Sequence, residues 1–273
     1  LTSTMNLLND TRGDFYLGLT SFGCPEFVDL RVEGREKRYN ATLLMIDNHP
    51  MIHYPFFMSQ LPLHAEHEAM GAHFSYEGEW PLPAYYVDPP SEYQTARKTV
   101  GLADLSHHGN YLIAGEDRVS FLQNLMSNDV QQATSNQGIF SALLTAKGKI
   151  LATFHLYSLS DAYLMTMESI LSEKTVAHLN RFKFRSKIKI SPLRWGKLLL
   201  VGPQARPFLT AFLGSPPPDS AQSFFVRETD PVLCICQSET EYLLYCREEN
   251  LPAFYQTLLQ AGSEWGIAPM GQA

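Results

Sequence analysis

"DLSHHGNYLIAGEDRVSFLQNLMSNDV", residues Asp104–Val130, joins a histidine pair, a strand and an amphipathic helix in one short unit. We expect a strand at "NYLIAG", residues 110–115. In "EDRVSFLQNLM" apolar residues recur at intervals of three and four, which predicts a helix with one buried face. Ser127, Asn128 and Asp129 are expected to terminate it. The unit therefore predicts a strand followed directly by a helix.

The rest of the chain alternates hairpins with single helices. Lys147-Gly148 is expected to form a two-residue hairpin loop in which Gly148 supplies the positive φ. Ser91 is expected to cap a helix that stops at Gly101. This order predicts an α+β fold with mainly antiparallel sheets. Strands are expected at 139–145, 149–158, 162–167, 186–191, 197–202, 223–228, 232–238 and 241–246, and further helices at 172–182, 203–214 and 248–262.

Composition restricts the class of protein. The chain has 273 residues, of which 45% are hydrophobic and 18% charged, as in globular proteins. Its net charge, 21 − 28 = −7, disfavours binding to nucleic acid or to an anionic membrane surface. One local exception is "RFKFRSKIKI", residues 181–190, for which a half-buried edge strand is favoured over an anion-binding stripe.

Cysteine usage and the absence of a targeting pattern favour the cytoplasm. Four cysteines are too few for a disulfide scaffold. Cys234 and Cys236 are two apart on an expected strand, which suits core thiols better than a zinc site. No run of eighteen apolar residues and no export signal is found.

Residues 1–57 differ from the remainder. They show no sustained helical or strand period and no motif, and Met58 is an internal candidate start. We therefore expect an extension over 1–57 and a domain over 58–273.

Two groups of residues are candidates for chemistry. His64, His67 and His73 are expected to be solvated or locally bonded rather than metal ligands. Asp129 follows a helix apolar enough to be buried, so it could be a catalytic carboxylate that holds a proton. Alternatively, Asn128 and Asp129 are ordinary turn formers.

Several ordered motifs resemble a known family. "GEWPLPAYYVDPPSEYQTARKTVGLADLSHH", which begins at Gly78, and the later "GEDRVSFLQ" and "NDV" resemble the folate-binding aminomethyltransferase superfamily. The resemblance runs from about Leu61 to Ala273. It implies a folate-binding module with a ferredoxin-like α+β part, and tetrahydrofolate as the cofactor. It also makes Asp129 the counterpart of the catalytic aspartate of the glycine-cleavage T-protein.

Some positions depart from the T-protein pattern. Thr145 and Met167 replace asparagines, and His108 stands where a methionine is typical. "LLTAKGKI" and "LNRFKFRSKIKIS" resemble the YgfZ-type branch, folate-binding proteins that support iron-sulfur enzymes. The K-G-C-Y-x-G-Q-E motif of that branch is absent, but "AGSEWGIAPMGQA" resembles the segment before it, so the chain is expected to be truncated at its carboxyl end.

The first hypothesis is a tetrahydrofolate-binding protein of the YgfZ type that supports assembly or repair of iron-sulfur enzymes. Alternatives are an aminomethyltransferase, with Asp129 orienting the folate nitrogen, and a non-catalytic interaction module. Whether the protein is an enzyme therefore stays open. By correspondence, the residues expected around folate with Asp129 are His108, Asn128, Phe140, Thr145 and Met167.

Overall fold

The chain divides into two units, Leu1–Ser59 and Gln60–Ala273. The computed structural model describes residues 60–145, 147–227 and 232–272, and within residues 1–59 only the backbone of short strands. Met58 and Cys24 lie outside the described residues. In the first unit, strands form where the sequence shows no sustained period. They are β1 (Asn6–Asn9), β2 (Phe15–Gly18), β6 (His49–His53) and β5 (Thr42–Ile46) in one sheet, and β3 (Val28–Val32) paired with β4 (Arg35–Tyr39).

The second unit contains a five-stranded antiparallel sheet in the order β11-β12-β13-β10-β14. On one face of it, Phe121, Leu122 and Leu179 from two helices pack against strand residues such as Ile113 and Met165. The strands are β10 (Gly109–Ala114), β11 (Ile139–Leu144), β12 (Ile150–Ser158), β13 (Ala162–Met167) and β14 (Lys189–Pro192), and the helices are α3 (Arg118–Gln123) and α4 (Ser169–Phe182).

A six-stranded sheet has the order β16-β17-β18-β15-β9-β19, with only the β19–β9 pair parallel among these described strands. Helix residues Phe208, Leu209, Tyr255 and Leu258 cover its outer face. The strands are β9 (Val100–Asp104), β15 (Trp195–Val201), β16 (Phe224–Arg227), β17 (Val232–Ser238), β18 (Glu241–Arg247) and β19 (Ile267–Pro269), and the helices are α5 (Ala205–Leu213) and α6 (Leu251–Ala261).

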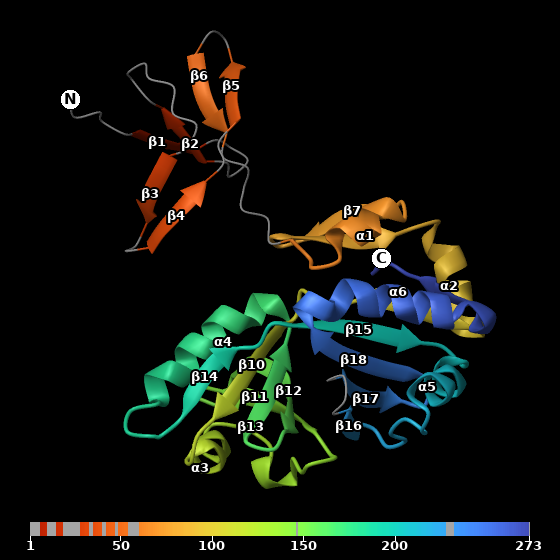
Figure 1. Ribbon diagram of the computed structural model, residues 1–273. Coiled ribbons are helices and arrows are strands. Elements are labelled where there is room, and N and C mark those ends of the chain that lie inside the picture. The colour runs from red at the N-terminus through yellow and green to blue at the C-terminus, as the bar shows by residue number, and fades with distance from the viewer. Residues whose placement is uncertain are drawn as a thin grey trace. The chain divides into compact units, whose positions relative to one another are not determined.

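The inner faces of the two sheets share one core. Tyr157 and Leu164 of the first sheet pack with Leu233, Leu243 and Tyr245 of the second. The second unit is thus layered as helices, sheet, sheet, helices, with α4 beside the first sheet and α6 along β15 and β18 (Figure 1). This confirms the α+β fold with mainly antiparallel sheets. The remaining elements are α1 (His64–Ala69), the hairpin β7 (His73–Glu77) and β8 (Trp80–Tyr85), α2 (Pro89–Lys98), and short 3₁₀ turns η1 (Val130–Gln132), η2 (Glu248–Asn250) and η3 (Ser263–Trp265).

Three predicted helix boundaries are wrong. Asp88, not Ser91, caps α2, because its carboxylate accepts a hydrogen bond from Ser91 N at 2.9 Å. Gly101 lies inside β9 rather than ending the helix. Helix α3 ends at Gln123, well before Asn128, because Met126 leaves the helix and pairs with Leu143 of β11.

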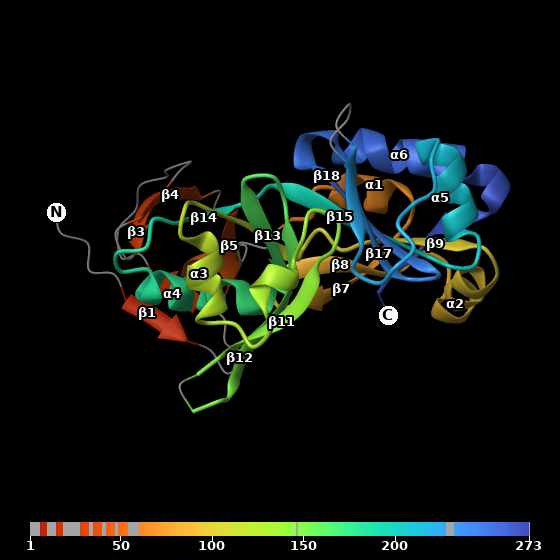
Figure 2. The same ribbon diagram turned by 90° about the horizontal axis from the view of Figure 1, so that it is seen from below.

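The loop between β11 and β12 is longer than predicted. Thr145 N donates to Lys149 O at 2.8 Å, so more than two residues form the turn, and Gly148 has the expected positive φ of 74°. The hairpin extends past the end of β13 (Figure 2).

The basic segment 181–190 is an edge strand only at its end. Helix α4 continues to Phe182, residues 183–188 form a loop in which Phe184 has a φ of 32°, and only Lys189 and Ile190 belong to the edge strand β14. Cys234 and Cys236 are buried in the core, as predicted for core thiols. Among the described residues, we find no helix with the length and apolarity needed to cross a membrane.

Candidate functional site

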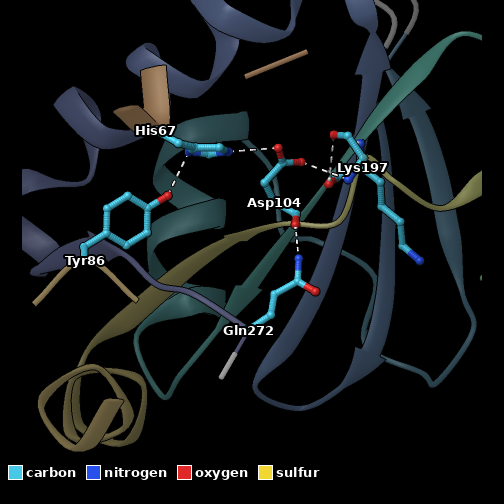
Figure 3. Close-up of polar contacts among 6 residues, drawn as sticks. His67, Tyr86, Asp104, Lys197 and Gln272 are labelled. Atoms are coloured by element: carbon cyan, nitrogen blue, oxygen red, sulfur yellow. Dashed lines mark hydrogen bonds and ion pairs between the residues drawn. The ribbon is translucent and has the colours of Figure 1, made fainter. Parts of the chain in front are cut away.

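A buried polar network connects α1, the residue that follows β8, and β9 (Figure 3). His67 Nε2 lies 3.0 Å from Asp104 Oδ2, and His67 Nδ1 lies 2.8 Å from the hydroxyl of Tyr86. A carboxylate only accepts, so Nε2 carries the proton and Nδ1 accepts from Tyr86. Burial raises the pKa of Tyr86, so its hydroxyl keeps its proton. We call His67, Tyr86, Asp104 and Ser106 the Asp104 network.

The Asp104 network holds neighbouring backbone in place. The second carboxylate oxygen of Asp104 accepts from Ser106 N at 2.9 Å. The hydroxyl of Ser106 accepts from Lys197 N at 3.1 Å and donates to Lys197 O at 3.5 Å, so it fixes β15 at Lys197. Gln272 Nε2 donates to Asp104 O at 2.5 Å, which ties the end of the described chain to β9 (Figure 3).

The histidine expectation is wrong for His67, which is fully buried and bonded to residues far along the chain rather than solvated or locally bonded. His64 forms a local contact of 3.5 Å with Glu68, and His73 stacks on Tyr85. No group of three or more candidate metal ligands occurs among the residues that the structure describes.

A second polar cluster lies where the two sheets face each other. We call His108, His155, Thr166, Lys197 and Tyr245 the inter-sheet cluster. Lys197 Nζ lies 3.0 Å from His108 Nδ1 and 5.9 Å from the ring centre of Tyr245. Burial lowers the pKa of Lys197 to about 8. Burial and the charge of Lys197 lower the pKa of His108 to about 2, so its imidazole is neutral and Nδ1 accepts.

A row of side chains crosses the inner face of the first sheet. Phe140, His155, Thr166 and Asn110 are directly opposite one another on β11, β12, β13 and β10. The Phe140 and His155 rings are 5.0 Å apart, and Phe140 is 53% exposed. Thr166 Oγ1 accepts from the Tyr245 hydroxyl at 3.4 Å. The row therefore connects an exposed aromatic ring with the inter-sheet cluster.

Asn128 and Asp129 lie beside this row. Asn128 Nδ2 donates to Phe140 O at 3.1 Å, which holds the residue before Asp129 against the backbone of β11. Asp129 itself is exposed, and its carboxylate caps η1 by accepting from Gln131 N at 3.0 Å. The expectation of a buried carboxylate at a helix end is therefore wrong, because α3 stops earlier and the chain turns back along β11.

Thr145 and Met167, the other two positions expected around folate, make contacts elsewhere. The hydroxyl of Thr145 accepts from Lys149 N at 3.0 Å within its own hairpin loop. Met167 is 3% exposed and packs in the core on the helix-covered face, opposite to Thr166. The structure thus associates His108, Asn128, Asp129 and Phe140 with one region and leaves Met167 out of it.

Sequence reasoning missed Lys197 and His155. The available signal was weak: Lys197 begins the apolar run "KLLLVG", and His155 interrupts "ATFHLYS". Both side chains alternate onto the inner faces of their sheets, which a strand period alone does not identify.

The chain matches known proteins over most of its length. The family model of the GCVT N-terminal domain matches residues 63–273. Aminomethyltransferases of Geobacillus sp. (strain WCH70) and Desulfitobacterium hafniense (strain Y51) are 28% and 27% identical over 226 residues, which is 78% of this chain. The chain spans 61% of the length of these relatives.

Solved structures agree on the fold. The glycine cleavage system aminomethyltransferase T of Bartonella henselae aligns with a TM-score of 0.70 and 25% identity, over 78% of this chain and 60% of that one. A chain of the heterotetrameric sarcosine oxidase of Corynebacterium sp. U-96 aligns with a TM-score of 0.53 at 15% identity, over 77% of this chain and 97% of that one, a likeness of fold alone.

Proposed function

Because the chain belongs to the GCVT N-terminal domain family, we propose that it binds tetrahydrofolate and takes part in transferring an aminomethyl-derived one-carbon unit to it. The observation that carries the proposal is the exposed Phe140 ring, which lies 5.0 Å from the His155 ring and whose backbone oxygen accepts a hydrogen bond from Asn128, the residue before Asp129. A pterin is a flat, polar heterocycle. An open aromatic ring with polar groups along its edge is the surface such a ring stacks on.

The surrounding groups offer both donors and acceptors. His155 Nδ1 lies 2.8 Å from Gln222 Oε1, which acts as the acceptor, so Nδ1 carries the proton and Nε2 is left as an acceptor. In His108 the arrangement is reversed: Nδ1 accepts from Lys197, which leaves Nε2–H as a donor. Burial lowers the pKa of His155, so both imidazoles stay neutral. A heterocycle with mixed donor and acceptor edges suits such a set.

Asp129 has the electrostatic role in this proposal. Positive charge develops as a one-carbon unit leaves an amine, and a fixed carboxylate near it lowers the barrier. The cap to Gln131 N orients this carboxylate even though it is exposed. The names of the aminomethyltransferase relatives favour this reaction over iron-sulfur support. Iron-sulfur clients, a cytoplasmic location and the absence of nucleic-acid binding stay predictions.

Calorimetric titration of the full chain with tetrahydrofolate, and separately with its 5-formyl form, tests the proposal. We expect saturable binding that weakens about tenfold or more in Phe140→Ala, since stacking contributes on the order of 1–3 kcal/mol per ring. Phe182→Ala is the matched control, because Phe182 is a similarly exposed aromatic at 46% and lies on α4.

The contribution of Asp129 is tested with Asp129→Asn, since the amide oxygen can still cap η1 while the charge is lost. We expect weaker folate binding than in Asp161→Asn, which removes another exposed carboxylate. Absence of binding by the folded wild-type chain would refute the proposal and favour a non-catalytic interaction module.

A further inference from the structure

Lys197 carries a buried amine without a counter-charge. The residue is 6% exposed, and among the described residues its Nζ has one hydrogen-bond partner, the neutral His108. No described carboxylate forms an ion pair with it, and the exposed Glu168 acts on it only at longer range. Burying an unpaired ammonium is unfavourable, so the environment lowers the pKa of the amine and raises its neutral fraction above that of an exposed lysine. A fold that needed only an apolar contact here would be better served by methionine or leucine.

Hydrogen bonds fix Lys197 both at its backbone and at its side-chain amine. The backbone of Lys197 is held by the Ser106 hydroxyl, which belongs to the Asp104 network. Its side chain extends away from Asp104 (Figure 3). Its Nζ donates one N–H to His108 Nδ1. An amine and a neighbouring acceptor at hydrogen-bond distance is the arrangement that directs a nucleophile.

We propose that Lys197 is a nucleophilic amine that forms a Schiff base with a small carbonyl compound, with formaldehyde as the smallest substrate of the class. In this step Nζ attacks the carbonyl carbon and a C=N bond replaces the C=O bond. The two amine protons leave with the carbonyl oxygen as one water molecule, and no oxidant or reductant is required. Hydrolysis returns the free amine. His108 is a positioning residue, because it stays neutral and orients Nζ.

Burial gives this amine its selectivity. A side chain with 6% exposure is reached by a one-carbon aldehyde more readily than by a large one. The inference rests on the proposed function only for the identity of the carbonyl, since a one-carbon unit bound for tetrahydrofolate passes through the oxidation level of formaldehyde. Reactivity of the amine does not require folate.

The test is reductive methylation of the folded full chain with limiting ¹³C-formaldehyde and cyanoborohydride at pH 7, followed by peptide mass spectrometry. At this pH about a tenth of Lys197 is neutral, whereas an exposed lysine with a pKa of about 10.4 is neutral in roughly one molecule in 2,500. We therefore expect Lys197 to be labelled up to about two-hundredfold faster than the exposed Lys98 and Lys174. The α-amino group, with a pKa near 8, is an internal reference for a reactive amine.

The pH profile separates reactivity from accessibility. The labelling ratio of Lys197 to Lys174 is expected to be constant below pH 8 and to fall above it, because Lys197 is then almost fully neutral and gains no further reactivity. His108→Gln keeps an acceptor for Nζ, so the labelling ratio of Lys197 to Lys174 should stay close to that of the wild type. His108→Leu has no acceptor, and the ratio should fall at least tenfold. A propionaldehyde arm should label Lys174 and not Lys197.

Labelling of Lys197 no faster than of Lys174, in a chain shown to be folded by circular dichroism, would overturn the inference. Equal labelling of Lys197 in the wild type and in His108→Leu would show that His108 does not position the amine. Because no folate is present, failure here leaves the proposed function standing. Failure of the folate titration would leave a positive labelling result intact.

Discussion

The Asp104 network and the inter-sheet cluster are two buried polar regions joined by Ser106, and they differ in how their charges are satisfied. Asp104 accepts from His67 and from Ser106 N, so its carboxylate is hydrogen-bonded on both oxygens. Lys197 has a single neutral partner. A satisfied buried charge fixes backbone geometry, whereas an unsatisfied one lowers stability and remains available for chemistry. The comparison predicts that removing the charge of Asp104 lowers the free energy of unfolding, whereas removing the charge of Lys197 raises it.

The largest effect is expected at Asp104. Asp104→Ala leaves His67 and the N–H of Ser106 without their buried acceptor. We expect the free energy of unfolding to fall by about 2–6 kcal/mol, because two buried donors lose their acceptor at about 1–3 kcal/mol each. Urea unfolding followed by circular dichroism measures it. Asp161→Ala, at an exposed turn position, is the control and should change stability by less than about 0.5 kcal/mol. A loss at Asp104 no larger than in this control would show that the network does not stabilise the fold.

Removing the charge of Lys197 is expected to stabilise the protein. Folding lowers its pKa to about 8 from about 10.4 in the unfolded chain. Between these pH values the unfolded chain binds a proton that the folded chain does not, so the unfolding free energy rises with pH there, and the full penalty applies below pH 8. Lys197→Met should therefore raise the unfolding free energy at pH 7 by up to about 3 kcal/mol.

Urea titrations from pH 6 to 10 check this result. The wild type should gain stability between pH 8 and 10, and the difference from Lys197→Met should shrink over the same range. Lys174→Met, at an exposed helix position, should follow the wild type. A destabilised Lys197→Met protein with an unchanged pH profile would mean that Lys197 is structural.

The sequence predicts the elements better than the site. Continuous apolar runs identified the strands at Ala162–Met167 and Val232–Ser238, because both faces of each strand are largely buried. The helix that ends at Phe182 was also predicted, although it begins earlier, at Ser169. Helix ends were less accurate: α3 stops early because pairing of Met126 with β11 overrides the local pattern. Asp129 was visible as a possible turn former, but the cap of α2 was assigned to Ser91 rather than Asp88, because the exact position of a cap depends on the backbone.

Tertiary pairing decides the rest. His67 meets Asp104 across 37 positions of sequence, and no local pattern encodes that distance. Thr166 and Met167 are neighbours in the chain, yet one faces the other sheet and the other faces the helices. The local sequence does not distinguish Lys197 from an exposed surface lysine. Only the packing of one sheet on the other shows that it is buried. The buried charge of Lys197, which distinguishes the two regions, therefore cannot be predicted from the sequence without the packing of the two sheets.

The smallest effect on stability, and the sharpest test of the link between the regions, is expected at Ser106. Ser106→Ala removes the acceptor of Lys197 N, and a buried N–H without a partner costs about 1–3 kcal/mol. Ser120→Ala, which removes an exposed hydroxyl bonded to Asp117 O, should cost less. If the Asp104 network positions Lys197, Ser106→Ala also reduces the selectivity of Lys197 for ¹³C-formaldehyde over Lys174, although it removes no group from the inter-sheet cluster. A variant that loses stability with its labelling ratio unchanged would show that His108 alone orients the amine.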